Sequence, residues 1–129
     1  MSWQTARLNR EYDLLAPDGS EIRLLVQVAG GSLVHCTVQP GKVTQAVEHR
    51  TVAEVWYCVA GQGQLWRGKD DMDEVTPLCR GVAVTIPLGT RFQFRATGAQ
   101  ALELLITTMP PWPGADEALP VAGHWAATP

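Results

Sequence analysis

Apolar residues occur along the chain in short runs separated by turn residues, and they do not keep the 3.6-residue period of a helix. The run 91–96 alternates strictly, which puts Phe92 and Phe94 on one face of a strand. The runs recur about every 8–12 residues, a spacing typical of β-sandwiches and barrels. They predict strands at 21–28, 32–38, 54–60, 64–67, 81–87, 91–96 and 101–109.

The segments between these runs carry turn chemistry. Residues 16–20 read Ala-Pro-Asp-Gly-Ser, and the charged segment 68–74 is expected to be a loop. The tail 110–129 holds five of the nine prolines, so we expect it to run over the surface as an arm or lid instead of continuing a sheet. The pattern predicts one all-β domain over 1–129, with about eight strands in a closed or nearly closed jelly-roll barrel at about 20–109.

The composition and net charge of the chain argue against some classes of function. A chain of 129 residues with a net charge of −3 offers no basic stripe for phosphates, so nucleic-acid binding is not expected. No apolar run has the length of a membrane span, and the first residues lack a secretory signal. The three widely spaced cysteines do not form a disulfide pattern, which favours a cytoplasmic location.

Two polar residues flank a short connection between apolar runs, and they are the candidate site. Residues 50–53 would form a hairpin that places His49 opposite Glu54 at the mouth of the barrel. By the period-two rule Glu54, Trp56 and Cys58 share one face. Val47 and His49 likewise share a face of the preceding strand.

Two segments of the chain resemble the sequence motifs of the cupin superfamily. The first motif is a glycine, five residues, His-x-His, three or four residues, a glutamate, six residues and a glycine. Gly41, His49, Glu54 and Gly61 match it with the four-residue spacing. The second is a glycine, five residues, Pro-x-Gly, two residues and a histidine, and its matching residues are Gly81, Pro87 and Gly89. The resemblance covers about residues 30–107 and implies a cupin-type double-stranded β-helix.

The chain departs from the cupin motifs at two of the metal-binding positions. A cupin metal site uses three histidines and one glutamate, but Val47 and Phe92 stand at two of the histidine positions. Cys58 lies roughly 13 Å along the strand from Glu54, too far to share an ion.

Other side chains are poorly placed to complete such a site. Gln45 could approach His49 only through a bulge, and His35 is expected on the outer face or at a subunit contact. His124 could reach the pocket only if the tail closed over it.

Several functions therefore stay open. In the first, Val47, Trp56, Phe92 and Phe94, with Gln45 and Cys58 nearby, line a metal-free pocket for a small organic ligand. In that pocket Glu54 would raise the pKa of His49, and the pair would serve acid–base chemistry of the isomerase or epimerase kind.

The alternatives change the role of the same pair. His49 and Glu54 could hold iron, manganese, nickel or zinc in a dioxygenase, isomerase or lyase, or the protein could be a non-enzymatic sensor or scaffold. A hydrogen-bonded pair that only closes the hairpin is the structural alternative. The resemblance further implies a homodimer.

Overall fold

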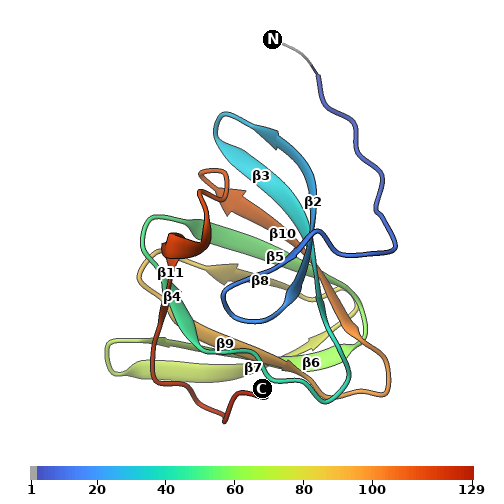
Figure 1. The fold of residues 1–129 in the computed structure, drawn as a ribbon. Helices are drawn as coiled ribbons and strands as arrows, with labels where there is room; N and C mark the ends of the chain where they lie inside the picture. The colour runs from blue at the N-terminus through green and yellow to red at the C-terminus, as the bar shows by residue number, and fades with distance from the viewer. Residues whose placement is uncertain (1–2) are drawn as a thin grey trace.

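The computed structural model describes residues 3–129, and this part of the chain forms eleven β-strands in two facing antiparallel sheets (Figure 1). The six-stranded sheet has the order β1-β2-β3-β10-β5-β8. Its strands are β1 (Leu14–Leu15), β2 (Glu21–Val28), β3 (Gly31–Val38), β5 (Ala53–Ala60), β8 (Ala83–Ile86) and β10 (Leu102–Met109). The five-stranded sheet has the order β11-β4-β9-β6-β7. Its strands are β4 (Val47–His49), β6 (Gln62–Lys69), β7 (Met72–Cys79), β9 (Arg91–Ala96) and β11 (Ala118–Pro120). No helix within residues 3–129 has the length and apolar character to cross a membrane.

The glycines of the two motifs occupy turns that other residues adopt poorly. Gly41, Gly61, Gly81 and Gly89 all have φ between 78° and 96°. This left-handed region costs L-residues with a Cβ, whereas glycine enters it freely. At Gly61 a Cβ would in addition collide with the backbone carbonyl of Ala101. The motif glycines therefore set the strand connections of the barrel.

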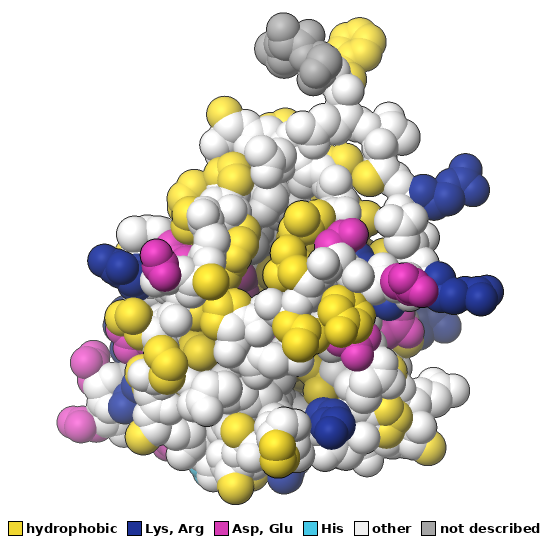
Figure 2. Space-filling view, viewed as in Figure 1, with side chains coloured by type: hydrophobic (Ala, Val, Ile, Leu, Met, Phe, Trp, Pro, Cys, Tyr) yellow, Lys and Arg dark blue, Asp and Glu magenta, His cyan; other side chains and the backbone are white. Residues whose placement is uncertain are grey.

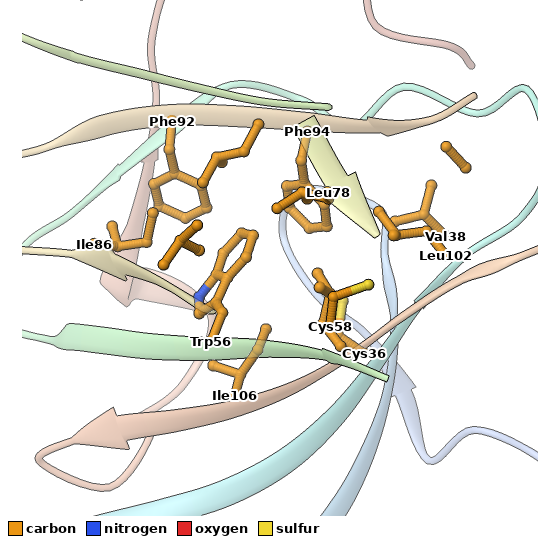
Figure 3. Packing of buried hydrophobic residues seen from close by; sticks show 14 of the residues in the cluster. Cys36, Val38, Trp56, Cys58, Leu78, Ile86, Phe92, Phe94, Leu102 and Ile106 are labelled. Carbon is orange, nitrogen blue, oxygen red and sulfur yellow. The ribbon is translucent and has the colours of Figure 1, made fainter. Parts of the chain in front are cut away.

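The core lies between the two sheets and is formed by the inward face of each strand (Figure 3). Trp56, Phe92 and Phe94 meet in the middle, with ring centroids of Trp56 4.8 Å from Phe94 and 5.7 Å from Phe92. In Figure 3, Trp56 and Ile86 lie toward one end of the core and Cys58 lies toward the other. The alternation in the sequence predicted these inward faces correctly.

Two connections differ from the expectation. The segment 68–74 is not a loop, because β6 and β7 run through it and meet in a tight turn. β7 is an exposed edge strand, so it lacks the apolar alternation by which a strand is recognised. Residues 50–53 are not a hairpin within one sheet, since β4 and β5 belong to different sheets. Residues 50–52 cross between the sheets, and Ala53 is the first residue of β5.

The tail also continues a sheet, contrary to the expectation of a surface arm. β11 pairs antiparallel with β4, and Ala118 lies opposite His49. Proline is tolerated there because β11 is an edge strand. Residues beyond β11 cross the outer face of the five-stranded sheet, where the buried amide of Gln93 bonds the backbone of His124 and Trp125.

Candidate functional site

A cavity opens at the end of the barrel where the tail and the β1–β2 segment meet the two sheets. The volume of the cavity is about 60 Å³, measured as the space that the centre of a water molecule can occupy. That exceeds the roughly 10–15 Å³ that one water needs, so a small organic group can enter. Its lining is mostly apolar: Leu14, Ala16, Pro17, Ile22, Leu24, Val34, Cys36, Trp56, Phe92, Phe94, Ile106, Trp112 and Ala118. Its polar lining residues are Asp18, Ser20, His49, Glu54 and Thr108.

His49 and Glu54 approach each other across the mouth of the barrel from opposite sheets. Nδ1 of His49 lies 3.9 Å from Oε2 of Glu54, and both side chains are only 6% exposed. The crossover at 50–53 places them there, with β4 delivering the histidine and β5 the glutamate. The structure therefore brings the two predicted residues close together, through a crossover between the sheets instead of the expected hairpin.

Burial dominates the chemistry of Glu54. Its Oε1 accepts a hydrogen bond from Nε1 of Trp56 at 2.9 Å, which favours the ionised form. Burial works against ionisation more strongly and raises the pKa of Glu54 to about 8, and the nearby carboxyl of Asp18 adds to this rise. Glu54 is therefore mostly protonated at neutral pH and has a proton to donate.

Burial also governs His49, in the opposite direction to the sequence-based expectation. The ring lies edge-on to Phe92 and Trp112, at centroid distances of 5.0 and 5.1 Å. Desolvation by this environment lowers the pKa of His49, although Glu117 and the Val52 backbone act to raise it. The predicted increase from Glu54 does not appear, because a largely protonated carboxyl has no charge with which to stabilise an imidazolium. His49 is thus a neutral ring, and its buried Nδ1 has no hydrogen-bond partner.

Asp18 and Ser20 belong to the cavity but were missed in the sequence. Oδ1 of Asp18 accepts hydrogen bonds from the backbone nitrogen and the hydroxyl of Ser20, at 2.8 and 2.6 Å. Asp18 is half-buried as a residue and lines the cavity, and burial raises its pKa despite these bonds. Asp-Gly-Ser is ordinary turn chemistry, so the sequence carried no signal for this role.

The tail fixes the other side of the cavity. Glu117 is buried and its carboxylate accepts hydrogen bonds from the backbone nitrogen and hydroxyl of Thr51, while its carbonyl accepts one from the Arg50 nitrogen. Burial acts to raise the pKa of Glu117, but these bonds outweigh it and lower the pKa. This anchoring holds Trp112 over His49, so the tail residue covers the cavity.

The remaining candidate residues lie elsewhere. Trp56, Phe92 and Phe94 line the cavity, whereas Val47 and Cys58 are buried in the core without lining it. Gln45 is exposed, and its amide bonds the backbone carbonyls of Ala46 and Val121.

The other two histidines are both outside the cavity. His35 is on the outer face of β3, as the alternation predicted, but it is only 3% exposed. His124 stacks on Trp66 at the outer face of the five-stranded sheet, and so does not reach the cavity.

The side chains at this end of the barrel do not fit a resident metal ion. Among residues 3–129, no group of three or more His, Cys, Asp or Glu side chains is arranged to hold one. The two other histidine positions of the motifs are Val47 and Phe92, which are buried apolar residues paired across β4 and β9. Catalytic zinc sites usually have three protein ligands, so a site of this kind would be one ligand short.

The model of the cupin domain family matches residues 34–108, which is more than half of the chain, and the chain belongs to this family. No curated protein matches the chain.

Solved structures share the fold at low sequence identity. A Streptomyces PAC13 variant with uridine is 19% identical, with a TM-score of 0.73 over 94% of this chain and 92% of that one. BH2720 from Bacillus halodurans is 21% identical, with a TM-score of 0.68 over 82% of this chain and 75% of that one. The CENP-C cupin domain of Drosophila melanogaster is 13% identical, with a TM-score of 0.62 over 69% of this chain and 68% of that one. This fold therefore occurs in proteins of quite different character, and function has to be argued from the cavity.

Proposed function

We propose that this cupin binds a small organic molecule in the cavity and exchanges protons with it through His49 and Glu54, without a resident metal ion. The observation that carries the proposal is the convergence of two buried proton-exchanging groups, 3.9 Å apart, in an otherwise apolar cavity. Few polar groups converging in an apolar pocket are typical of a small-molecule site. The PAC13 structure with uridine adds support, since it pairs a similar fold with a small ligand.

The two groups hold complementary protonation states. At neutral pH, Glu54 carries a proton and His49 is neutral, so one can donate while the other accepts. In an isomerase or epimerase step, the C–H bond beside a carbonyl breaks and its proton passes to His49. The carbonyl oxygen takes the proton of Glu54, which gives an enol. His49 then returns its proton to the other face of the same carbon or to the neighbouring carbon, and an enol hydroxyl returns a proton to Glu54, which restores both groups.

The test uses chelator-treated protein, with uridine and a panel of sugars and hydroxy ketones as probes. Binding is followed by the fluorescence of Trp56 and Trp112, and proton abstraction by incorporation of deuterium from D2O into the probe. At least one probe should bind, and His49→Gln and Glu54→Gln should each weaken binding about tenfold and abolish exchange.

The matched controls are His35→Gln and Glu103→Gln, which alter a second histidine–carboxylate pair outside the cavity. They should leave binding unchanged. Binding that appears only after divalent ions are added would contradict the proposal. So would binding that survives in both cavity variants, and a non-enzymatic scaffold predicts this second result.

The proposal includes a homodimer. The outer face of the six-stranded sheet exposes Val28, Val55, Tyr57 and Met109 at 39–75% of their surface, an unusual apolar set for a free sheet face. A second copy of the chain would cover it. Sedimentation should give a dimer for the wild type and a monomer for Tyr57→Lys, whereas a wild-type monomer would overturn this part. The three free cysteines support a reducing compartment such as the cytoplasm.

A further inference from the structure

We propose that the occupant of the cavity is a protonated amine that carries a small apolar group. This inference rests on the proposed function, because it concerns the ligand of the same cavity. The observation behind it is that several polar atoms of residues lining the cavity have no hydrogen-bond partner in the described part of the chain.

The first such atom belongs to Glu54. Trp56 occupies Oε1, but no hydrogen bond within residues 3–129 reaches Oε2. Nδ1 of His49 lies 3.9 Å from Oε2, which is beyond hydrogen-bond distance. In the protonated form of Glu54, Oε2 carries the proton, and in the ionised form it is an acceptor without a donor.

The second atom belongs to Asp18 and repeats this arrangement. Both donors of Ser20 bond Oδ1, and in the described part of the chain none reaches Oδ2. Two bonds to one oxygen hold the carboxyl in a fixed orientation. They leave its other oxygen available to an occupant of the cavity.

The third atom is Nδ1 of His49, whose residue is only 7% exposed. A neutral imidazole has one nitrogen that accepts a hydrogen bond. With the ring proton on Nε2, Nδ1 is that acceptor, and it lies beside Glu54.

Apart from the proton of Glu54, the buried indole and hydroxyl donors of the cavity are already used. The indole of Trp56 bonds Glu54, the hydroxyl of Ser20 bonds Asp18, and the hydroxyls of Thr108 and Ser32 bond each other. No lysine or arginine lines the cavity. When Glu54 and Asp18 are ionised, three acceptors, two of them carboxylate oxygens, thus belong to a cavity that no basic side chain lines.

An ammonium group matches this set, because it offers three N–H donors and one positive charge. The apolar part of the ligand would lie against Val34, Ile106 and the rings of Phe94 and Trp112. Aromatic rings also favour a cation over a neutral group. An amine that enters in its neutral form takes the proton of Glu54: the O–H bond breaks, an N–H bond forms, and a carboxylate–ammonium pair results. The ammonium then holds the proton that a carbonyl oxygen would receive in the proposed step.

Figure 2 shows how charge is distributed on one face of the molecule. Hydrophobic side chains gather in the middle of this face, and most lysines and arginines lie toward its margins.

The experiment compares matched probes that differ only in the polar group: benzylamine, benzyl alcohol and benzoate, and likewise n-butylamine, 1-butanol and butanoate. Dissociation constants are measured by NMR titration at 150 mM salt and pH 7. In at least one series the amine should bind at least tenfold more tightly than the alcohol, and the carboxylate should not bind.

Two double variants test which carboxyl groups cause the preference for the amine over the alcohol. The double variant Asp18→Asn/Glu54→Gln should reduce the amine-to-alcohol ratio to less than threefold, while the alcohol itself changes little. Asp70→Asn/Asp71→Asn removes two carboxylates from the β6–β7 turn and should keep the wild-type ratio, which controls for general attraction to an acidic protein.

The outcomes distinguish the two proposals. Equal binding of amine and alcohol would overturn the amine inference but leave the small-molecule cavity intact. A preference that survives in the Asp18/Glu54 double variant would also overturn it, because the cation would then bind elsewhere. Failure of all six probes would overturn the inference too, and the separate panel with uridine would still test the proposed function.

Discussion

The protein contains two histidine–carboxylate pairs, which differ in almost every property. Glu54 on β5 points into the barrel, whereas Glu103 on the neighbouring strand β10 points outward. In the inner pair the closest atoms are 3.9 Å apart and both side chains are 6% exposed. In the outer pair His35 Nε2 lies 2.9 Å from Glu103 Oε1, and the glutamate side chain is 37% exposed.

The difference shows that a short distance does not identify a reactive pair. Water reaches Glu103, so the outer pair is an ordinary hydrogen-bonded contact. Desolvation lowers the pKa of His35, although Glu103 acts to raise it. Both members of the inner pair are shielded from solvent and make no hydrogen bond to each other, and burial raises the pKa of the glutamate to about 8. The longer, more deeply buried pair is the one that we propose exchanges protons with a ligand.

The largest expected effect is on the pH dependence of stability, through Glu54. Its pKa in the folded state is about 8 against an ordinary value of 4.5, so the folded protein holds this proton more tightly than the unfolded chain. The resulting stabilisation is full below pH 4.5 and is lost as the pH rises through about 8, by up to about 5 kcal/mol.

Urea denaturation at pH 5 and pH 9 measures this loss. Glu54→Gln should lose much less stability over that interval than the wild type, and Glu103→Gln should follow the wild type. A parallel decline of wild type and Glu54→Gln would show that another group, such as Asp18, is responsible.

The second effect comes from Trp112, which covers His49. Trp112→Ala should cost about 2 kcal/mol, because a partly buried ring is lost. It should also let water reach His49 and move its pKa up toward 6.5. The lowered pKa of His49 contributes stability above pH 6.5 that is lost as the pH falls. In this variant the free energy of unfolding should therefore decrease less steeply as the pH falls below 6.5.

NMR titration of the histidine rings follows this change directly. Trp125→Ala is the matched control, since Trp125 stacks on Arg95 at the outer face of the five-stranded sheet. An unchanged His49 titration in Trp112→Ala would contradict the role of Trp112 as a cover.

The third prediction concerns His35 in the outer pair, where we expect a substitution to change stability but not ligand binding. His35→Gln should cost about 1 kcal/mol, because it removes a hydrogen bond from a buried side chain. It should leave probe binding in the cavity unchanged. Chemical denaturation gives the free energy of unfolding, and a probe titration on the same sample gives the dissociation constant. Weaker probe binding in His35→Gln would mean that the two pairs are coupled.

The smallest effect is expected from Glu103→Gln. The amide keeps a hydrogen-bonding group beside His35, and exposed ion pairs contribute about 0–1 kcal/mol. The free energy of unfolding should fall by less than about 1 kcal/mol. A loss of several kcal/mol would contradict this prediction and would show that the outer pair is not an ordinary exposed contact.

Local patterns in the sequence were sufficient to predict much of the barrel. Strand alternation fixed the inward faces of β5 and β9, because the period of two is a property of the extended backbone. The glycines of the two motifs were readable for a similar reason, since a positive φ is a local demand. His49 and Glu54 could be singled out because polar residues at the edge of an apolar run are conspicuous.

Only the tertiary structure decided how these parts combine. It made a strand of the charged segment around β7, where an edge needs no apolar pattern, and it paired the tail with β4. It brought Asp18 and Trp112 to the cavity from positions remote in sequence. It also reversed the expected direction of the His49 pKa, because desolvation depends on everything packed around a side chain and on no single neighbour.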